Sequence, residues 1–298
     1  MMIREDKMDI NEYKFGGHET FYIRKGWLYK GLKNLETNSF VFTDKTINTS
    51  DTFGLGGNMV KSLRFWLQAV GLTKEEKVKS SMQQVLTELG SIIDNYDRYM
   101  EEVGTLCLLH YMLSTNSKLA SSWYYFFNEF NMREFTKEDY MDSILSFLKF
   151  RQISTSDKTL EGDFNCILNT YIPRKSVDPE DNMECPLSDL GLIEVVDKKI
   201  YRKSTPKEGI IPLKVLLALI IYQHPGETEI KISDLLKEKN SVGKVFNMDF
   251  ITLSSYLDKM QMENLIQVVR TAGLDVIKIK DNKKFEDCVV DYYEGIRN

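Results

Sequence analysis

The feature that most constrains this chain is a pair of glycine-rich blocks near its start, each followed directly by an amphipathic stretch. The first block spans residues 15–27 and the second spans residues 51–66. Glycine is used where the backbone takes a positive φ or approaches another group closely. A helix that begins just after such a turn offers free N–H groups and the positive end of its dipole to an anion. Both blocks therefore predict a place where a phosphate or carboxylate can bind.

The hydrophobic pattern predicts a mainly α-helical chain with small β-hairpins. Apolar residues recur at helical spacing in segments that predict helices over 20–35, 58–70, 81–94, 101–113, 120–130 and 137–150. Thr20 and Thr136 stand where N-caps are expected. Residues 40–42 are a short strand candidate between turns, and residues 173–189, which contain three prolines and several acids, are predicted to form an exposed connection.

Two segments follow the chain order of a winged helix, in which a cluster of helices is closed by a β-hairpin. In the last third, helices are predicted over 212–222, 232–238 and 248–265, followed by strands over 266–269 and 275–280 around a turn at 271–273. In the middle third, the predicted helices are followed by a hairpin over 190–202 with its turn at 197–199. The sequence therefore predicts a multi-domain helical protein with a C-terminal winged-helix domain and a second winged-helix-like unit.

Length and charge suggest where the domains divide. The 298 residues are enough for two or three domains, which we place at 1–80, 81–205 and 206–298. The net charge of −5 is unevenly distributed along the chain. Each segment carries 13 Lys and Arg, but the first has 10 Asp and Glu, the second 20 and the third 14, so their net charges are +3, −7 and −1. Because both glycine blocks lie in the positive segment, nucleic-acid binding is predicted to be local to it.

Several classes of protein are disfavoured. The four cysteines are scattered without a C-x-x-C pair, which predicts buried reduced thiols rather than disulfides or a zinc site. The longest apolar run, residues 213–222, is too short to span a bilayer, and the N-terminus lacks an apolar signal core. A cytoplasmic location without a membrane partner is therefore expected. The turn at 54–58 lacks the G-K-[ST] ending of a nucleotide-binding loop, so an ATPase is not predicted.

His18 and Glu19 are the candidate catalytic residues. His18 is the histidine that stands next to an acid within a glycine turn, and it could act as a general base or, with Glu19 and Asp51, as a ligand of a divalent metal such as Mg²⁺ or Mn²⁺. That site requires the two blocks to pack together. In the structural alternative, His18 and Glu19 tie the first turn to the second block through hydrogen bonds to Asn58 or Asp51.

The candidate phosphate-binding residues come from both blocks. They are Arg24, Asn58, Lys61, Arg64 and the backbone of Gly56 and Gly57. An arginine can hold a phosphate by two hydrogen bonds, and Lys61 and Arg64 share one face of a predicted helix. In the alternative, the second turn serves to let Trp66 pack beneath Trp27.

The third predicted helix of the C-terminal unit is acidic, with Asp249, Asp258 and Glu263 against Lys259. Acidic groups repel DNA phosphates, so this helix favours protein docking over direct reading of bases.

Taken together, the two blocks resemble an uncharacterised bacterial domain family of DNA-modification and phage-defence operons, which includes the SspB-type proteins of DNA phosphorothioation systems. Residues 185–193 are also similar to that family, so the resemblance covers nearly the whole chain. It implies a DNA-acting component that works with a cysteine desulfurase, an ATPase and a reductase-like sulfur-transfer protein. Two hypotheses stay open: a DNA-nicking endonuclease that uses His18 and Glu19, or a non-catalytic DNA-binding or scaffolding subunit.

Overall fold

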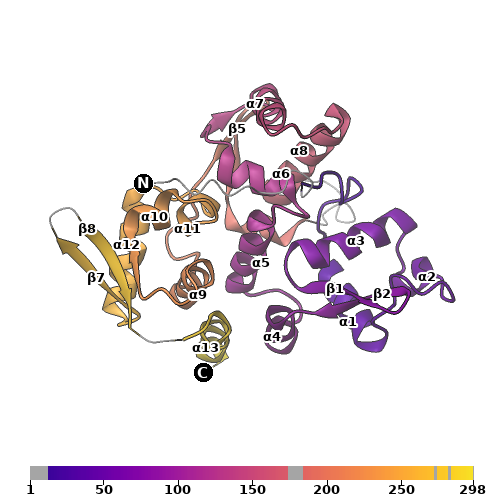
Figure 1. Ribbon diagram of the computed structural model, residues 1–298, viewed down its shortest axis with the longest axis horizontal. Coiled ribbons are helices and arrows are strands. Elements are labelled where there is room, and N and C mark those ends of the chain that lie inside the picture. Colours follow the sequence, from indigo (N-terminus) through magenta and orange to yellow (C-terminus); the bar gives the residue numbers. More distant parts are fainter. Residues whose placement is uncertain (1–12, 174–183, 272–273, 281–282, 298) are drawn as a thin grey trace.

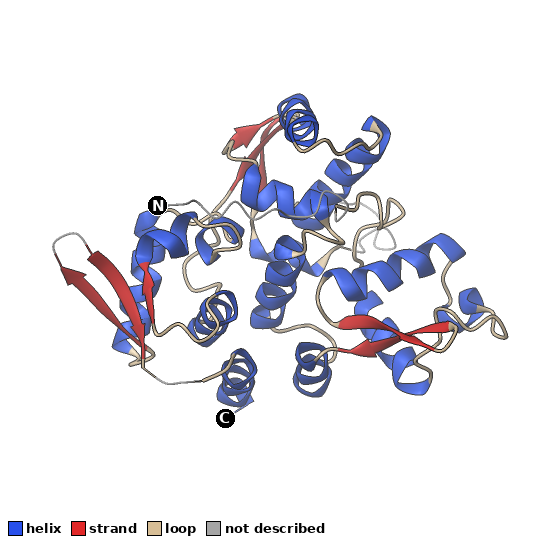
Figure 2. Cartoon of the chain, in the orientation of Figure 1, coloured by secondary structure: helices blue, strands red, loops and turns tan. Residues whose placement is uncertain are grey.

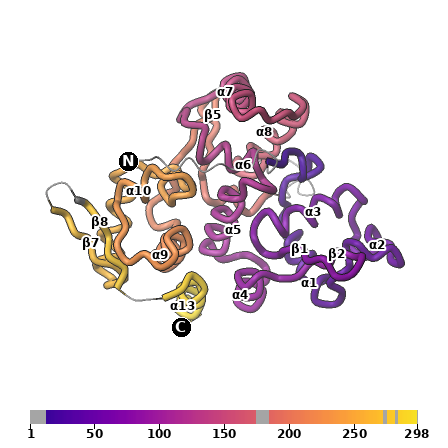
Figure 3. Tube along the Cα trace, viewed as in Figure 1, coloured from indigo at the N-terminus to yellow at the C-terminus, as the bar shows by residue number. Residues whose placement is uncertain are grey.

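The computed structural model describes residues 13–173, 184–271, 274–280 and 283–297. Over these residues the chain is mainly helical, with one two-stranded and two three-stranded antiparallel sheets (Figure 2). The trace in Figure 3 runs from the N-terminal part on one side, through a central group of helices, to the C-terminal part on the other side. The predicted mainly α fold with small β-hairpins is confirmed.

The first third forms three helices and a hairpin: α1 (Trp27–Thr37), α2 (Thr49–Phe53), α3 (Gly57–Ala69), β1 (Thr73–Val78) and β2 (Ser81–Leu86). α3 confirms the helix predicted over 58–70. The helix predicted from residue 20 begins only at Trp27, and its N-cap is Gly26 rather than Thr20. The reason is local, because Glu19, Thr20 and Gly26 have φ of 50°, 68° and 79°, outside the range of a right-handed helix.

Two other predictions in this region are wrong. Residues 40–42 form turns rather than a strand, and the Phe42 ring stacks 4.8 Å from that of Phe53. The helix predicted over 81–94 is half strand: β2 pairs with β1 along six residues, and α4 (Glu88–Tyr96) begins only after the Thr87 side chain caps it. The periodicity of one window cannot reveal a pairing partner that precedes it in the chain.

The middle third holds the elements α5 (Val103–Thr115), α6 (Ser121–Tyr124), the π-helix η2 (Tyr125–Glu129), β3 (Glu134–Phe135), α7 (Lys137–Phe150), α8 (Asp157–Tyr171), the 3₁₀ helix η3 (Pro186–Leu190), β4 (Ile193–Asp197) and β5 (Ile200–Lys203). Thr136 begins α7 with a capping box to Asp139, as its position predicted. The sheet has the strand order β3–β5–β4, and its β4–β5 hairpin confirms the one predicted over 190–202.

Helix α8 was not predicted, and the connection predicted over 173–189 is partly wrong. Residues 174–183 lie outside the described residues, but η3 follows them, packs against α5 and buries Leu187 and Leu190. This part of the connection belongs to the core.

The last third holds α9 (Leu213–Gln223), β6 (Glu229–Lys231), α10 (Ile232–Lys237), α11 (Val242–Val245), α12 (Phe250–Met262), β7 (Ile266–Thr271), β8 (Leu274–Ile279) and α13 (Phe285–Arg297). The predicted helices and the two strands at 266–269 and 275–280 are confirmed, while residues 272–273 of the predicted turn lie outside the described residues. β6 adds a third strand in the order β6–β8–β7. α13, which was not predicted, packs against α9 and α4 (Figure 1).

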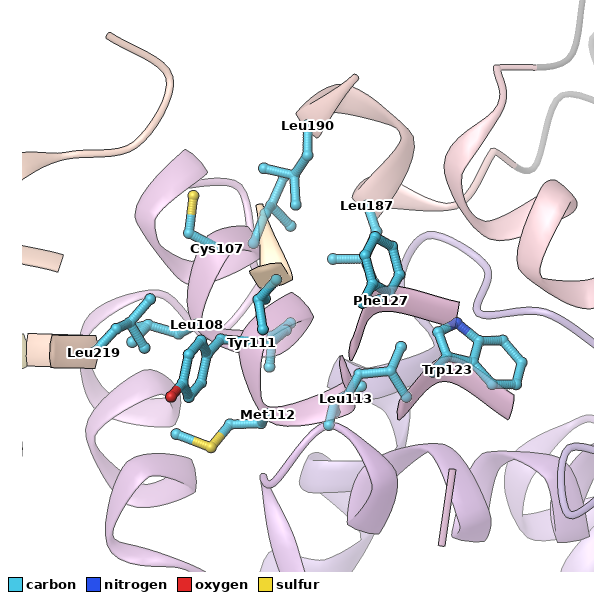
Figure 4. Packing of buried hydrophobic residues seen from close by; sticks show 14 of the residues in the cluster. Cys107, Leu108, Tyr111, Met112, Leu113, Trp123, Phe127, Leu187, Leu190 and Leu219 are labelled. Carbon is cyan, nitrogen blue, oxygen red and sulfur yellow. The ribbon is translucent and has the colours of Figure 1, made fainter. Parts of the chain in front are cut away.

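Helix α5 lies at the centre of the molecule. Eleven of its residues are buried, and it packs against η3, α6, α9 and η2. Figure 4 labels one side chain from each of these elements, namely Leu187, Trp123, Leu219 and Phe127. A helix that is apolar on all sides is typical of such a position. Among the described residues, no helix combines the length and hydropathy needed to cross a bilayer. All four cysteines are buried reduced thiols, as predicted, and burial raises the pKa of Cys185 to about 12.

Candidate nucleic-acid interface

The first glycine block folds into a tight turn over residues 16–20. Gly16 has a φ of 72°, and the amide of Phe21 donates to the carbonyl of His18 at 2.8 Å. A Cβ added to Gly17 would lie 2.7 Å from the Phe65 ring, which is closer than real Cβ contacts allow. These glycines are therefore required for the backbone shape and for close packing against α3 and α8.

His18 lies inside this turn and is 1% exposed. Its Nε2 donates to Oδ1 of Asp163 on α8 at 2.7 Å, and Asp163 also accepts from the Gly16 amide at 3.0 Å and the Ser122 hydroxyl at 2.5 Å. The imidazole stacks on Trp66 with ring centroids 6.0 Å apart. The hydrogen-bonded tie to the second block that the structural alternative predicted for His18 is wrong: His18 bonds to Asp163 of α8 rather than to Asn58 or Asp51.

Asp163 is the residue of this network that sequence reasoning missed. It lies 145 residues beyond His18, and it is 1% exposed on the apolar face of α8, beside Leu160, Phe164 and Ile167. An acid within an apolar helical stripe must have a buried partner, because an unpaired buried carboxylate is costly. That stripe was the signal available in the sequence.

Glu19 and Asp51 do not join His18. The Glu19 side chain is exposed while that of His18 is buried, and Asp51, on α2, is exposed and accepts from the side chain of Asn48 at 2.7 Å. Over the described ranges, no group of three or more His, Cys, Asp or Glu side chains could hold a metal ion. The residues proposed as ligands therefore do not fit a divalent metal site. The catalytic roles of His18 and Glu19 stay predictions.

Arg24 lies in a pocket of about 230 Å³ that also contains the acids Glu101, Glu184 and Asp189. Its guanidinium packs over the Trp27 ring, 5.4 Å from the centroid, and its Nε is buried without a hydrogen-bond partner among the described residues. Lys25 also lines the pocket, so acids outnumber bases around Arg24 by three to one.

The second glycine block opens helix α3 toward solvent. Gly56 is its N-cap and makes no side-chain cap bond, and a Cβ added to Gly56 or Gly57 would meet no atom closer than 4.0 Å. Lys61 is exposed, and its Nζ lies 3.4 Å from Oδ1 of Asn58. One turn further, the Arg64 Nε donates to Glu75 of β1 at 2.6 Å. Asn58, Lys61 and Arg64 thus come together on one helix.

A groove adjoins this helix at the tip of the β1–β2 hairpin. It has a volume of about 1040 Å³, and its basic lining residues are Lys45, Arg64 and Lys79, against the single acid Asp44. Hydrogen bonds from Thr46 lower the pKa of the Asp44 carboxyl. Lys45 and Lys79 are exposed, and hydroxyls from Thr43, Ser80 and Ser81 complete the polar lining.

The predicted site is therefore divided. The structure brings the α3 residues together beside a basic groove, whereas Arg24 lines a different pocket and His18 is buried behind α3. Trp66 also differs from its predicted contact: its indole donates to the Phe21 carbonyl at 2.9 Å and packs against Trp123.

Comparison with known proteins gives a family and a fold. The model of the family described as "Protein of unknown function (DUF4007)" matches residues 15–293. A magnesium ion-bound SspB crystal structure is similar with a TM-score of 0.83 and 24% sequence identity, over 96% of this chain and 89% of that chain. A second SspB crystal structure gives a TM-score of 0.84 and 24% identity, over 97% and 91%. No curated protein matches the chain.

Proposed function

This chain belongs to the DUF4007 family, and from that premise we propose that it binds DNA as a component of a phosphorothioation-type modification and phage-defence system. The likeness in fold to SspB supports the assignment to such a system. In this proposal, the segments 1–80, 81–205 and 206–298 are three domains with separate tasks, and β2 belongs to the first of them, because it pairs with β1 across the boundary at residue 80. The partners are DNA and the other proteins of the system, namely a cysteine desulfurase, an ATPase and a reductase-like sulfur-transfer protein.

The observation that carries the proposal is the basic groove beside α3. The lining cations Lys45 and Lys79, with Arg64 already ion-paired to Glu75 at 2.6 Å, stand against the one lining acid Asp44 and make a local positive surface on a chain whose net charge is −5. Such a surface attracts the phosphates of a nucleic-acid strand, while hydroxyls and free helix amides position them. Lys45 and Lys79 supply exposed charge at the two sides of the groove, and the open N-terminus of α3 supplies amide donors.

The C-terminal domain supports a scaffolding task. Its order of α9, β6, α10 to α12, β7 and β8, with the sheet order β6–β8–β7, is that expected of a winged helix. On α12, the exposed apolar residues Phe250, Ile251 and Met262 accompany Asp258, which pairs with Arg270 at 3.0 Å. An apolar and acidic helix suits a protein partner better than a DNA groove.

The binding proposal is tested by fluorescence anisotropy of labelled DNA at several salt concentrations. We expect affinity to fall steeply with salt, and K45Q and K79Q each to reduce the slope of log K against log salt by about 1. K158Q, which removes an exposed lysine far from the groove on α8, is the matched control. The same slope of log K against log salt in the wild type, K45Q, K79Q and K158Q would contradict the proposal.

A second candidate function is DNA nicking, favoured by the fact that one SspB structure of this fold was solved with a magnesium ion. It is tested by incubating supercoiled plasmid with the protein and Mg²⁺ or Mn²⁺, and by comparing H18A and E19A with the wild type. Binding without relaxation of the plasmid supports the scaffolding function. Equal nicking by all three proteins would remove His18 and Glu19 from the chemistry.

A further inference from the structure

A second basic pocket lies where the middle third of the chain meets the last third. It has a volume of about 320 Å³ and is lined by η2 and the segment after it, by β5, and by residues of α10, α11 and the start of α12. Its charged lining residues are Arg133, Lys203, Lys237 and Lys244, with Asp249 as the one acid. This pocket was not foreseen from the sequence, because its charges come from separate segments of the middle and last thirds.

Lys203 is the buried member of this group. It is 8% exposed, and its ammonium donates to the carbonyls of Phe126 and Phe130, the latter at 2.5 Å. The same ammonium lies 4.5 Å from the centre of the Phe126 ring. An ammonium has three N–H donors, so these two bonds leave one for a further acceptor. Within the described part of the chain, no carboxylate forms an ion pair with Lys203.

The charged neighbour of Lys203 is another cation, which raises the free-energy cost of burying the Lys203 ammonium. A buried cation is normally balanced by an acid, because removal of its hydration is unfavourable. Here the charged group that acts on Lys203 is Lys244, whose own ammonium donates to Oδ1 of Asn131 at 2.7 Å. The acid of the pocket, Asp249, caps α12, where its carboxylate accepts from the Thr252 amide at 2.8 Å, and the cation that acts on it is Arg133 rather than Lys203.

We propose that this pocket binds the phosphoryl group of a phosphorylated ligand, held by Lys203, Lys244 and Arg133. An oxyanion there would accept the remaining N–H of Lys203 and relieve the repulsion between the cations. Arg133 is exposed at the edge of the pocket and can supply a two-pronged guanidinium. The volume is in the range of pockets for small ligands.

This pocket is separate from the groove of the proposed function. Figure 1 shows α10 and α11 on the opposite side of the molecule from α3 and the β1–β2 hairpin. The inference therefore goes beyond DNA binding at the groove and does not depend on it. Two sources can supply the phosphoryl group, a free phosphorylated small molecule or a nucleic-acid strand, and the experiment below distinguishes them.

The occupied pocket has a predicted pH dependence. Burial, with a smaller contribution from Lys244, lowers the pKa of Lys203 to about 7. An anion that binds the protonated amine will therefore bind more tightly as the pH falls from about 8.5 to 6, since more of the Lys203 population is charged. Sulfate is the appropriate probe because its own charge does not change in this range.

The other charged groups that line the pocket with Lys203 are Arg133, Lys237, Lys244 and Asp249. A hydrogen bond from the Thr252 backbone lowers the pKa of Asp249, so that carboxylate stays ionised.

The neighbouring elements carry two further ionisable groups, His110 and Glu129. His110 packs against Phe127, and burial lowers its pKa to about 3, so it stays neutral. The Glu129 carboxylate of η2 is paired with Lys239 at 2.7 Å.

The test is isothermal titration calorimetry of the full chain with sulfate, inorganic phosphate, and a short single-stranded oligonucleotide with or without a 5′-phosphate. We expect sulfate and phosphate to bind, and R133Q and K203M to weaken them about tenfold or more. R133Q changes an exposed side chain, so it reports on the pocket even where K203M does not fold. K158Q is the control and is expected to bind like the wild type.

Each outcome bears on the proposal. In one outcome, the oligonucleotide binds more tightly than sulfate, and this binding is lost in R133Q but retained in K45Q and K79Q. That result supports the proposed pocket and identifies its ligand as nucleic acid. Equal binding of small anions and oligonucleotides supports it and assigns a small phosphorylated ligand. Absence of sulfate and phosphate binding at millimolar concentration, or affinities that are unchanged in R133Q, would overturn the proposal, whatever happens at the groove.

Discussion

The two glycine blocks resemble each other in sequence and differ completely in structure. The first is closed: Gly16 and Gly17 would clash with Thr159 and Phe65 if they carried a Cβ, and His18 is sealed against Asp163. The second is open, because Gly56 and Gly57 have no neighbour within 4.0 Å of an added Cβ. One block uses glycine to let elements pack, and the other uses it to leave a helix start exposed.

This difference shows what a glycine motif can and cannot indicate. A paired glycine predicts a turn in both cases, but only the surroundings decide whether the turn faces protein or solvent. A turn that faces protein holds the fold together, whereas a turn that faces solvent can hold a ligand. Three substitutions are expected to separate these roles, in order of decreasing effect.

The largest effect is expected for Asp163→Ala. It removes one carboxylate that accepts hydrogen bonds from the His18 ring, the Gly16 amide and the Ser122 hydroxyl. Removal of one partner from a buried polar network leaves the others unsatisfied, so the free energy of unfolding should fall by about 3 kcal/mol or more. Urea denaturation followed by circular dichroism measures this change.

The control for this variant is Asp142→Ala, an exposed acid on α7, which should change stability by less than about 0.5 kcal/mol. If Asp163→Ala left stability unchanged but abolished plasmid nicking, the first glycine turn would serve catalysis rather than packing. That result would contradict the difference drawn between the two glycine blocks.

The parts of the molecule that sequence predicted are those fixed by local interactions. α3 and α7 were placed nearly to the residue, because each has an apolar stripe and α7 has its own capping box at Thr136. β2 was mistaken for a helix because its partner strand and its burial are set by other elements.

The candidate site follows the same rule. Asn58, Lys61 and Arg64 share a helix, so their proximity could be predicted, whereas the contact of His18 spans 145 residues and could not. Lys203 shows the same limit, because its burial depends on carbonyls more than 70 residues earlier in the chain.

An intermediate effect is expected for Gly17→Ala, compared with Gly57→Ala as its matched counterpart. The new methyl group at residue 17 would lie 2.7 Å from the Phe65 ring, and such overpacking costs about 1–3 kcal/mol. At residue 57 the methyl group would lie 4.0 Å from the Ser50 hydroxyl, without overlap, and alanine favours a helix over glycine by up to about 1 kcal/mol. The two variants should therefore shift the midpoint of thermal unfolding in opposite directions. A loss of stability in both would mean that the second turn is packed as well.

The smallest effect is expected for DNA affinity in Lys61→Gln, compared with Arg24→Gln. Lys61 is exposed on α3, the helix that contributes Arg64 to the groove, so its loss should weaken DNA binding about two- to fivefold at low salt and leave stability unchanged. Arg24 lines a separate pocket with the acids Glu101, Glu184 and Asp189, whose charge repels DNA phosphates, so Arg24→Gln should change the affinity less than Lys61→Gln does. Anisotropy titrations at two salt concentrations measure both. A larger loss of DNA affinity in Arg24→Gln than in Lys61→Gln would indicate that DNA binds across the pocket of Arg24 rather than in the groove beside α3. The first glycine block would then bind a ligand as the second does, which contradicts the difference drawn between them.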